Sequence, residues 1–97
     1  MKYLIITHFV ENNLHDSVEF RLFDNKADAL AYGSKDFEKT LLKVLDEQDA
    51  VFGEKMCDYV ERGEGEWRFC LFDKHYYSVT LVELKKNKNN YFGCSGY

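Results

Sequence analysis

The sequence predicts an α+β fold, a two-layer domain in which one long helix packs on one face of a four-stranded, mainly antiparallel sheet made of two hairpins. Two observations predict it. Two pairs of segments rich in β-branched and aromatic residues are each joined by polar turn residues, and a helix-length amphipathic segment separates the pairs. A chain of 97 residues forms a single domain, because two pieces would be too small to bury separate cores.

The first hairpin comes from residues 2–24. Residues 2–10 form a strand that is apolar on both sides, which is typical of the interior of a sheet. Residues 11–16 are turn-forming, and residues 17–24 alternate in a second strand. In that strand Val18, Phe20 and Leu22 point to one side, and Glu19, Arg21 and Phe23 to the other. We expect the first set to face the helix and the second set to face away.

A long helix follows, with Asp24 or Asn25 as its N-cap. Gly33 within it predicts either a close approach to the sheet or a break. We expect the helix to continue to Gly53, the next residue suited to end it, although acidic residues crowd its negative pole before that point. Apolar and small residues spaced by three and four define the buried face: Ala27, Leu30, Ala31, Ser34, Phe37, Leu41, Val44 and Leu45.

The second half of the chain supplies the other hairpin. Residues 54–62 fit either a short helix or a strand, and periodicity alone does not decide between them. Residues 66–73 and 76–85 predict two strands joined by a turn. In the first of these, Trp67, Phe69 and Leu71 share one face, and Arg68, Cys70 and Phe72 share the other. We place the domain at residues 1–86 and a polar, aromatic C-terminal tail at residues 87–97.

Charge is unevenly distributed along the chain. The formal net charge is −4, and residues 46–66 hold eight acidic residues against two basic ones. A protein that wraps duplex DNA would be basic instead. An acidic segment of this kind keeps a small protein soluble, and the alternative is a mimic of nucleic acid that occupies a groove on another protein. The acidic patch on which both interpretations depend consists of Asp46, Glu47, Asp49, Glu54, Asp58 and Glu61.

The cysteine count favours a reducing compartment. Three cysteines and no recognisable signal peptide argue against a disulfide framework and for a cytoplasmic location. A set of four possible metal ligands consists of Cys57, Cys70, His75 and Cys94. Their spacing in the sequence matches no known zinc-binding pattern. No apolar run is long enough to span a membrane. We therefore expect neither a metal nor a membrane association.

Motifs for catalysis are missing from the sequence. It contains no glycine-rich phosphate-binding motif and no nucleophile elbow. The carboxylates of Glu61, Glu64 and Glu66 lie around a turn open to water, where acid–base catalysis is not favoured. His8, on an apolar strand, is typical of a hydrogen-bonded core or rim histidine. We expect no enzyme activity and no cofactor.

The outward face of the sheet is the most informative feature for function. Aromatic residues and arginine, which interface cores are enriched in, gather there: Arg21, Phe23, Arg68, Phe72 and Tyr76. Monomers rarely leave such a patch uncovered. We predict a small acidic protein-binding module that regulates or inhibits a larger partner through this face, or that self-associates as a homodimer.

Two alternatives remain open at the sequence level. Residues 54–62 or the tail could fold back over the outward face and leave nothing to bind. The same face could instead stack the bases of single-stranded nucleic acid, with the basic cluster of Lys85, Lys86 and Lys88 nearby. The acidic net charge disfavours this second alternative.

Overall fold

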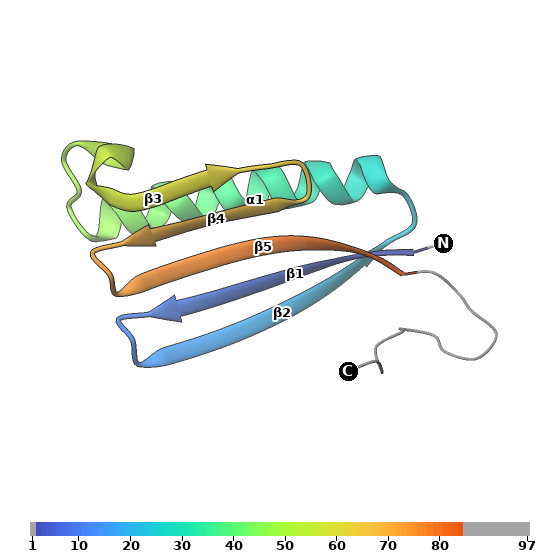
Figure 1. Ribbon diagram of the computed structural model, residues 1–97, viewed down its shortest axis with the longest axis horizontal. Helices are drawn as coiled ribbons and strands as arrows, with labels where there is room; N and C mark the ends of the chain where they lie inside the picture. Colours follow the sequence, from blue (N-terminus) through green and yellow to red (C-terminus); the bar gives the residue numbers. More distant parts are fainter. Residues whose placement is uncertain (1, 85–97) are drawn as a thin grey trace.

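The computed structural model describes residues 2–84. The elements are β1 (Lys2–Glu11), β2 (His15–Phe23), α1 (Lys26–Glu47), a 3-10 helix η1 (Gly53–Met56), β3 (Cys57–Arg62), β4 (Glu66–Leu71) and β5 (His75–Leu84). The strands form one antiparallel sheet in the order β2-β1-β5-β4-β3, with α1 behind it in Figure 1. The α+β class is confirmed, but the sheet has five strands and not four. The tail at residues 87–97 lies outside the described residues.

The segment at residues 54–62 supplies the additional strand. It begins within η1 and continues as β3, which pairs with β4 at one edge of the sheet. The register shifts between Cys57 and Tyr59, where Asp58 is the extra residue. A strand interrupted in this way has no clean period of two, and its apolar pattern therefore fits a short helix equally well.

Both hairpins are confirmed, and their turns lie side by side. Asn12 and Asn13 form the first turn with φ of 58° each, and Phe72 and Asp73 form the second with φ of 55° each. The amide of Asn13 donates a hydrogen bond of 3.1 Å to the carbonyl oxygen of Lys74. Left-handed backbone suits asparagine but is rare for a bulky residue such as phenylalanine.

The ends of α1 follow from local hydrogen bonds. Asn25 is the N-cap, and its Oδ1 accepts from the amide of Asp28 at 2.8 Å. The helix ends at Glu47, so the expectation that it continues to Gly53 is wrong. Asp49 takes the left-handed conformation instead, with φ of 56°. The amides of Asp49 and Ala50 then bond to the carbonyl oxygens of Asp46 and Leu45, at 3.1 and 2.9 Å, which closes the last turn.

The core lies between α1 and the central strands. The predicted burial of Phe37, Leu41, Val44 and Leu45 is confirmed. In the first turns, however, Ala29 and Gly33 are buried, whereas Ala27 and Ala31 are exposed. The sheet contributes Ile5, Trp67, Phe69, Leu71, Tyr77 and Val79 to this core.

Gly33 explains how the first half of α1 approaches the sheet. A Cβ at this position would lie 2.7 Å from Cζ3 of Trp67 and 3.3 Å from Cδ1 of Ile5. Only a residue without a side chain fits, so Gly33 marks a close approach and not a break in the helix. The missing side chain shifts the buried face of the helix toward Ala29 and Gly33.

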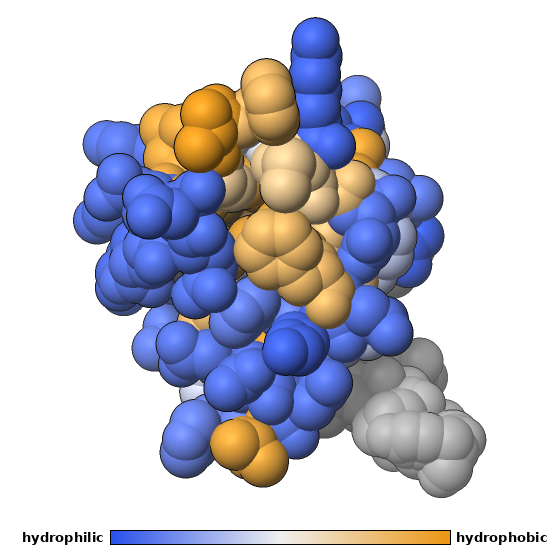
Figure 2. Space-filling view, turned by 90° about the vertical axis from the view of Figure 1, so that its left-hand side faces the viewer, coloured by the Kyte–Doolittle hydropathy of each residue, from blue (hydrophilic) through white to orange (hydrophobic). Residues whose placement is uncertain are grey.

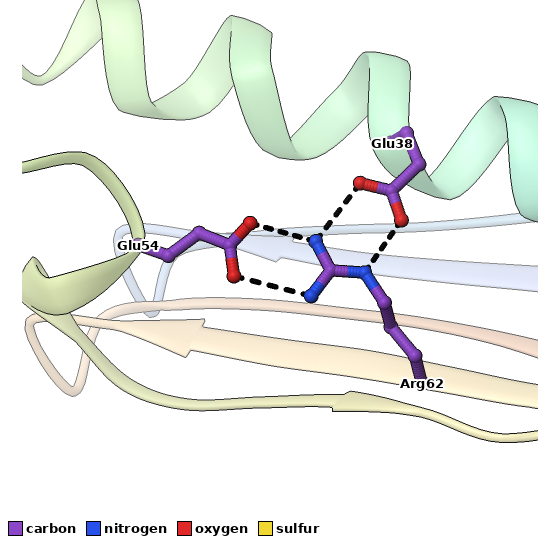
Figure 3. A network of polar contacts seen from close by, with 3 residues as sticks. All are labelled: Glu38, Glu54 and Arg62. Carbon is purple, nitrogen blue, oxygen red and sulfur yellow. Dashed lines mark hydrogen bonds and ion pairs between the residues drawn. The ribbon is translucent and has the colours of Figure 1, made fainter.

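A bidentate arginine joins three elements at the β3 edge (Figure 3). Arg62 of β3 donates from Nε and Nη2 to the carboxylate of Glu38 on α1, at 2.6 and 2.9 Å. Its Nη1 and Nη2 donate to Glu54 of η1, at 3.1 and 2.7 Å. These hydrogen bonds raise the pKa of Arg62 and lower that of Glu54. The network fixes the orientation of η1 and β3 relative to α1. Its contribution to the free energy of unfolding is small, because the side chains of all three residues are partly exposed to water.

We predict that Leu41→Ala lowers the free energy of unfolding by about 2–5 kcal/mol, because the side chain is fully buried and its removal leaves a cavity. Urea denaturation measures this. Leu42→Ala is the matched control, since that neighbouring side chain is 67% exposed, and we expect a change within about 0.5 kcal/mol. Equal effects of the two substitutions would contradict the assigned burial.

We predict that Gly33→Ala destabilises the protein, although the same change gains about 1 kcal/mol at an unconstrained helical position. The new methyl group would overlap the ring of Trp67, which is the only tryptophan and therefore reports the change by fluorescence. In a Trp67→Phe background, where the ring is smaller, the penalty of Gly33→Ala should shrink. An identical penalty in both backgrounds would show that the two residues are not in tight contact.

Candidate functional site

The sheet has one face without α1, which we call the distal face. It faces the viewer in Figure 1, and no helix or strand formed by residues 2–84 lies across it. The strand registers define which residues point to this side. They are Lys2, Leu4, Ile6, His8 and Val10 of β1, Asp16, Val18, Phe20 and Leu22 of β2, Tyr76, Ser78, Thr80, Val82 and Leu84 of β5, Glu66, Arg68 and Cys70 of β4, and Tyr59 and Glu61 of β3.

The predicted orientation of β2 is wrong. Arg21 pairs with the buried Ile5, and Phe23 pairs with Tyr3, so both point to the helix side. There the Arg21 guanidinium lies 4.9 Å from the ring centroid of Tyr32, and the Phe23 ring lies 5.3 Å from it. The tight β1–β2 turn fixes this register, and Tyr32 of α1 offers a favourable surface to the cation. Arg21 and Phe23 therefore do not belong to the distal face.

The reversal places apolar side chains of β2 on the distal face. Val18, Phe20 and Leu22 are 48%, 65% and 60% exposed. Phe20 lies opposite Ile6, and Leu22 lies opposite Leu4. The neighbouring residues of β1 and β5 are half-buried: Leu4, Ile6, Val10 and Val82. Together these seven residues form a contiguous apolar surface, which we call the apolar half of the distal face.

The other half of the distal face is aromatic and polar. Tyr59, Cys70 and Tyr76 lie side by side across β3, β4 and β5. Arg68 donates a hydrogen bond to Glu61, which raises the pKa of the arginine. A hollow of about 230 Å³ lies among His8, Tyr59, Arg68, Tyr76, Tyr77 and Ser78. The predicted distal positions of Arg68 and Tyr76 are thus confirmed, although this half is more polar than expected.

The β4–β5 turn at the end of this half is held by Asp58. Its Oδ2 accepts from the amide of Asp73 at 2.7 Å and from the Cys70 thiol at 3.3 Å. Phe72, predicted to be a strand residue, lies in this turn and is partly exposed. Polar atoms of Asp58, Cys70 and Asp73 lie within 4.8 Å of one another. Burial and Asp58 raise the pKa of the Cys70 thiol to about 11.

The other candidate ligand set does not come together. Cys57 and His75 both pair with Leu71 and lie on the helix side, whereas Cys70 lies on the distal face. Cys57 and Cys70 are both free thiols. Cys94 lies outside the described residues. The sheet therefore separates Cys57 and His75 from Cys70.

Half of the predicted acidic patch is engaged within the chain. Glu54 binds Arg62, Glu61 binds Arg68, and Asp58 accepts the hydrogen bonds of the β4–β5 turn. Asp46, Glu47 and Asp49 are exposed around the C-terminal end of α1. The patch is therefore not one continuous surface of free carboxylates.

A groove between α1 and the β1–β2 hairpin was not predicted. It consists of two hollows, of about 410 and 300 Å³, which share Thr7 and Glu19 in their lining. One extends to Arg21 and Tyr32, and the other to Asp36 and Lys43. The residues that line the groove come from β1, β2 and α1 and share no regular spacing in the sequence. The groove is therefore recognised only from the β1–β2 register and the position of α1 on the sheet.

Figure 2 shows the end of the molecule that carries η1 and the hairpin turns. Hydrophobic residues gather in the upper part, toward η1 and the end of α1, and again at the bottom near the β1–β2 turn. Val51, Phe52 and Leu14 are exposed loop residues of this part of the chain. Loops and turns supply this apolar surface, whereas regular strands supply the distal face.

No protein-family model, curated protein or solved structure matches this chain. Within residues 2–84, no helix combines the length and the apolar character needed to cross a membrane.

We predict that Cys70 makes the protein less stable in alkali. Its pKa is raised to about 11 in the fold, so its contribution to stability is complete below about pH 9 and is lost as the pH rises through 11. Urea midpoints at pH 7, 9, 10 and 11 should therefore fall less steeply for Cys70→Ala than for the wild type. Parallel curves for the two proteins would show that this thiol is not held neutral by the fold.

Proposed function

We propose that this chain is a small, acidic, non-enzymatic protein-binding module that regulates or inhibits a larger protein partner in the cytoplasm. The observation that carries the proposal is the exposure of Val18, Phe20 and Leu22 on a regular strand of a sheet face that no helix or strand formed by residues 2–84 covers. Large apolar residues in such a continuous arrangement are typical of an interaction surface.

The chemistry of the distal face supports protein binding. Its apolar half would supply the interface core, because apolar area removed from water contributes about 25 cal/mol per Å². Its polar half, with the Arg68–Glu61 pair, would supply the hydrated rim found around most interfaces. The expected partner is therefore a protein surface with apolar side chains at its centre and charges of both signs around them.

The state of the polar groups supports a function without catalysis. Cys70 is held as a neutral thiol, which is a poor nucleophile. His8 contacts the Asp16 carboxylate through Nε2 at 2.5 Å, and the hydroxyl of Tyr76 donates to Asp73 at 2.8 Å. These groups bind one another, and none is arranged as a nucleophile beside a base.

Binding of single-stranded nucleic acid is a second candidate function. The hollow among Tyr59, Arg68 and Tyr76 favours it, since aromatic rings beside an arginine can stack bases. The Arg68–Glu61 pair reduces the positive charge available to phosphates. Binding to a labelled oligonucleotide that weakens as salt increases would support this candidate, and an absence of binding at low salt would remove it.

The proposed function predicts that Phe20→Ser combined with Leu22→Ser abolishes partner capture. In a pull-down from a host lysate, we expect at least a tenfold loss of the captured partner, because buried aromatic and aliphatic anchors dominate binding energy. Leu42→Ser, an exposed leucine on the outer side of α1, is the matched control and should retain the partner. Circular dichroism verifies folding, and equal capture by all three proteins would exclude the distal face.

A further inference from the structure

The two edges of the sheet differ in how they are protected. β3 is six residues long, and its register with β4 shifts at Asp58, which disfavours pairing with another strand. β2 is nine residues long and pairs with β1 in an unbroken register from His15 to Phe23. It contains no proline and no bulge, and no element formed by residues 2–84 pairs with its outer side. Among residues 2–84, its outer backbone groups therefore have no strand to pair with, and an additional strand can add there.

The side chains of β2 are complementary to those of a second, antiparallel β2. Placing Phe20 opposite the partner's Phe20 puts Val18 opposite the partner's Leu22 on the distal side. On the helix side, the same register puts Glu19 opposite the partner's Arg21, and Arg21 opposite the partner's Glu19. Within residues 2–84 neither charge has an ion-pair partner, and the Arg21 guanidinium lies 4.9 Å from the ring centroid of Tyr32.

We propose that two copies of this chain associate through their β2 edges in this register, about a two-fold axis at Phe20. Such an axis is perpendicular to the sheet, keeps both helices on one side and makes each contact twice. It therefore requires residues of the same face to lie opposite one another. Around the axis, Val18 then meets the partner's Leu22, and Glu19 meets the partner's Arg21.

The neighbouring registers are disfavoured by charge. Moving the axis by one residue toward the N-terminus places Glu19 opposite the partner's Glu19, and moving it toward the C-terminus places Arg21 opposite the partner's Arg21. Like charges directly opposite each other destabilise a strand pair. In the proposed register Asp16 faces the partner's Asp24, and each Asp24 is already paired with Lys2 of its own chain.

This association goes beyond the proposed function. Both involve Val18, Phe20 and Leu22 on the distal side, but the association also needs the backbone edge of β2 and the helix-side charges of Glu19 and Arg21, which partner binding does not use. The two five-stranded sheets would join into one, and their distal faces would become a single continuous surface. Charge variants at Glu19 and Arg21 leave the apolar side chains of the distal face unchanged, so they test the association without removing the residues proposed to bind a partner.

Sedimentation equilibrium of the purified chain tests the proposal, because it measures the mass of the wild type and of variants in which the charges of Glu19 and Arg21 are reversed. We expect the wild type to have about twice the chain mass of 11.5 kDa. Glu19→Arg and Arg21→Glu should each be monomeric, with a dissociation constant raised at least tenfold, because each creates two like-charged pairs. The double variant restores opposite charges and should dimerise again. An equimolar mixture of the two single variants should form a heterodimer for the same reason.

Glu64→Arg and Lys39→Glu change the net charge equally at exposed positions away from β2 and should remain dimeric. Circular dichroism establishes folding, and the double variant shows whether the substitutions are tolerated together. A monomeric wild type at 100 μM, dimeric single variants, or a monomeric double variant would each overturn the proposal. Loss of partner capture in a monomeric Glu19→Arg variant would not overturn the proposal, because sedimentation equilibrium measures dimerisation directly.

Discussion

A single helix is narrower than the sheet on which it packs. With its side chains an α-helix is about 10–12 Å across, whereas the outer axes of five strands spaced about 4.8 Å apart are separated by roughly 19 Å. α1 therefore buries the central strands and leaves both sides of the helix layer incomplete. An arginine occupies each side: Arg62 lies 5.8 Å from the ring centroid of Phe37, and Arg21 lies 4.9 Å from that of Tyr32. Long side chains thus fill part of the helix layer on each side of α1, and a groove remains between α1 and the β1–β2 hairpin.

The sequence predicted the features that depend on local patterns. The Asn25 cap, both hairpins and the buried residues from Phe37 to Leu45 follow from spacing and turn chemistry. The end of α1 could not be predicted from glycine, because Asp49 takes the left-handed conformation in its place. β3 was ambiguous because its bulge at Asp58 interrupts the alternation.

The error in the candidate site has a different origin. Alternation shows that Phe20 and Arg21 lie on opposite faces of β2, but it does not show which face meets the helix. Pairing with β1 determines which face of β2 meets the helix. Both faces of β1 are apolar, so the sequence of β1 does not show which of its faces is buried under the helix. The structure resolves it by placing Arg21 beside Tyr32 and leaving Phe20 exposed. An alternating apolar pattern such as that of β2 is therefore compatible with two outcomes. The apolar side chains can belong to the core, or they can form a surface that another molecule covers.

The order of the strands also bears on how the chain folds during synthesis. β1 lies between β2 and β5, and its pairing with β5 joins residues 2–10 to residues 76–84. Contacts so distant in sequence form slowly, because a long loop must close first. Until β5 leaves the ribosome, one edge of the β1–β2 hairpin has no strand to pair with, and its apolar side chains stay exposed to water. Until β5 pairs with β1, the chain therefore presents an unpaired strand edge beside exposed apolar side chains, which is the kind of surface that makes folding intermediates prone to aggregate.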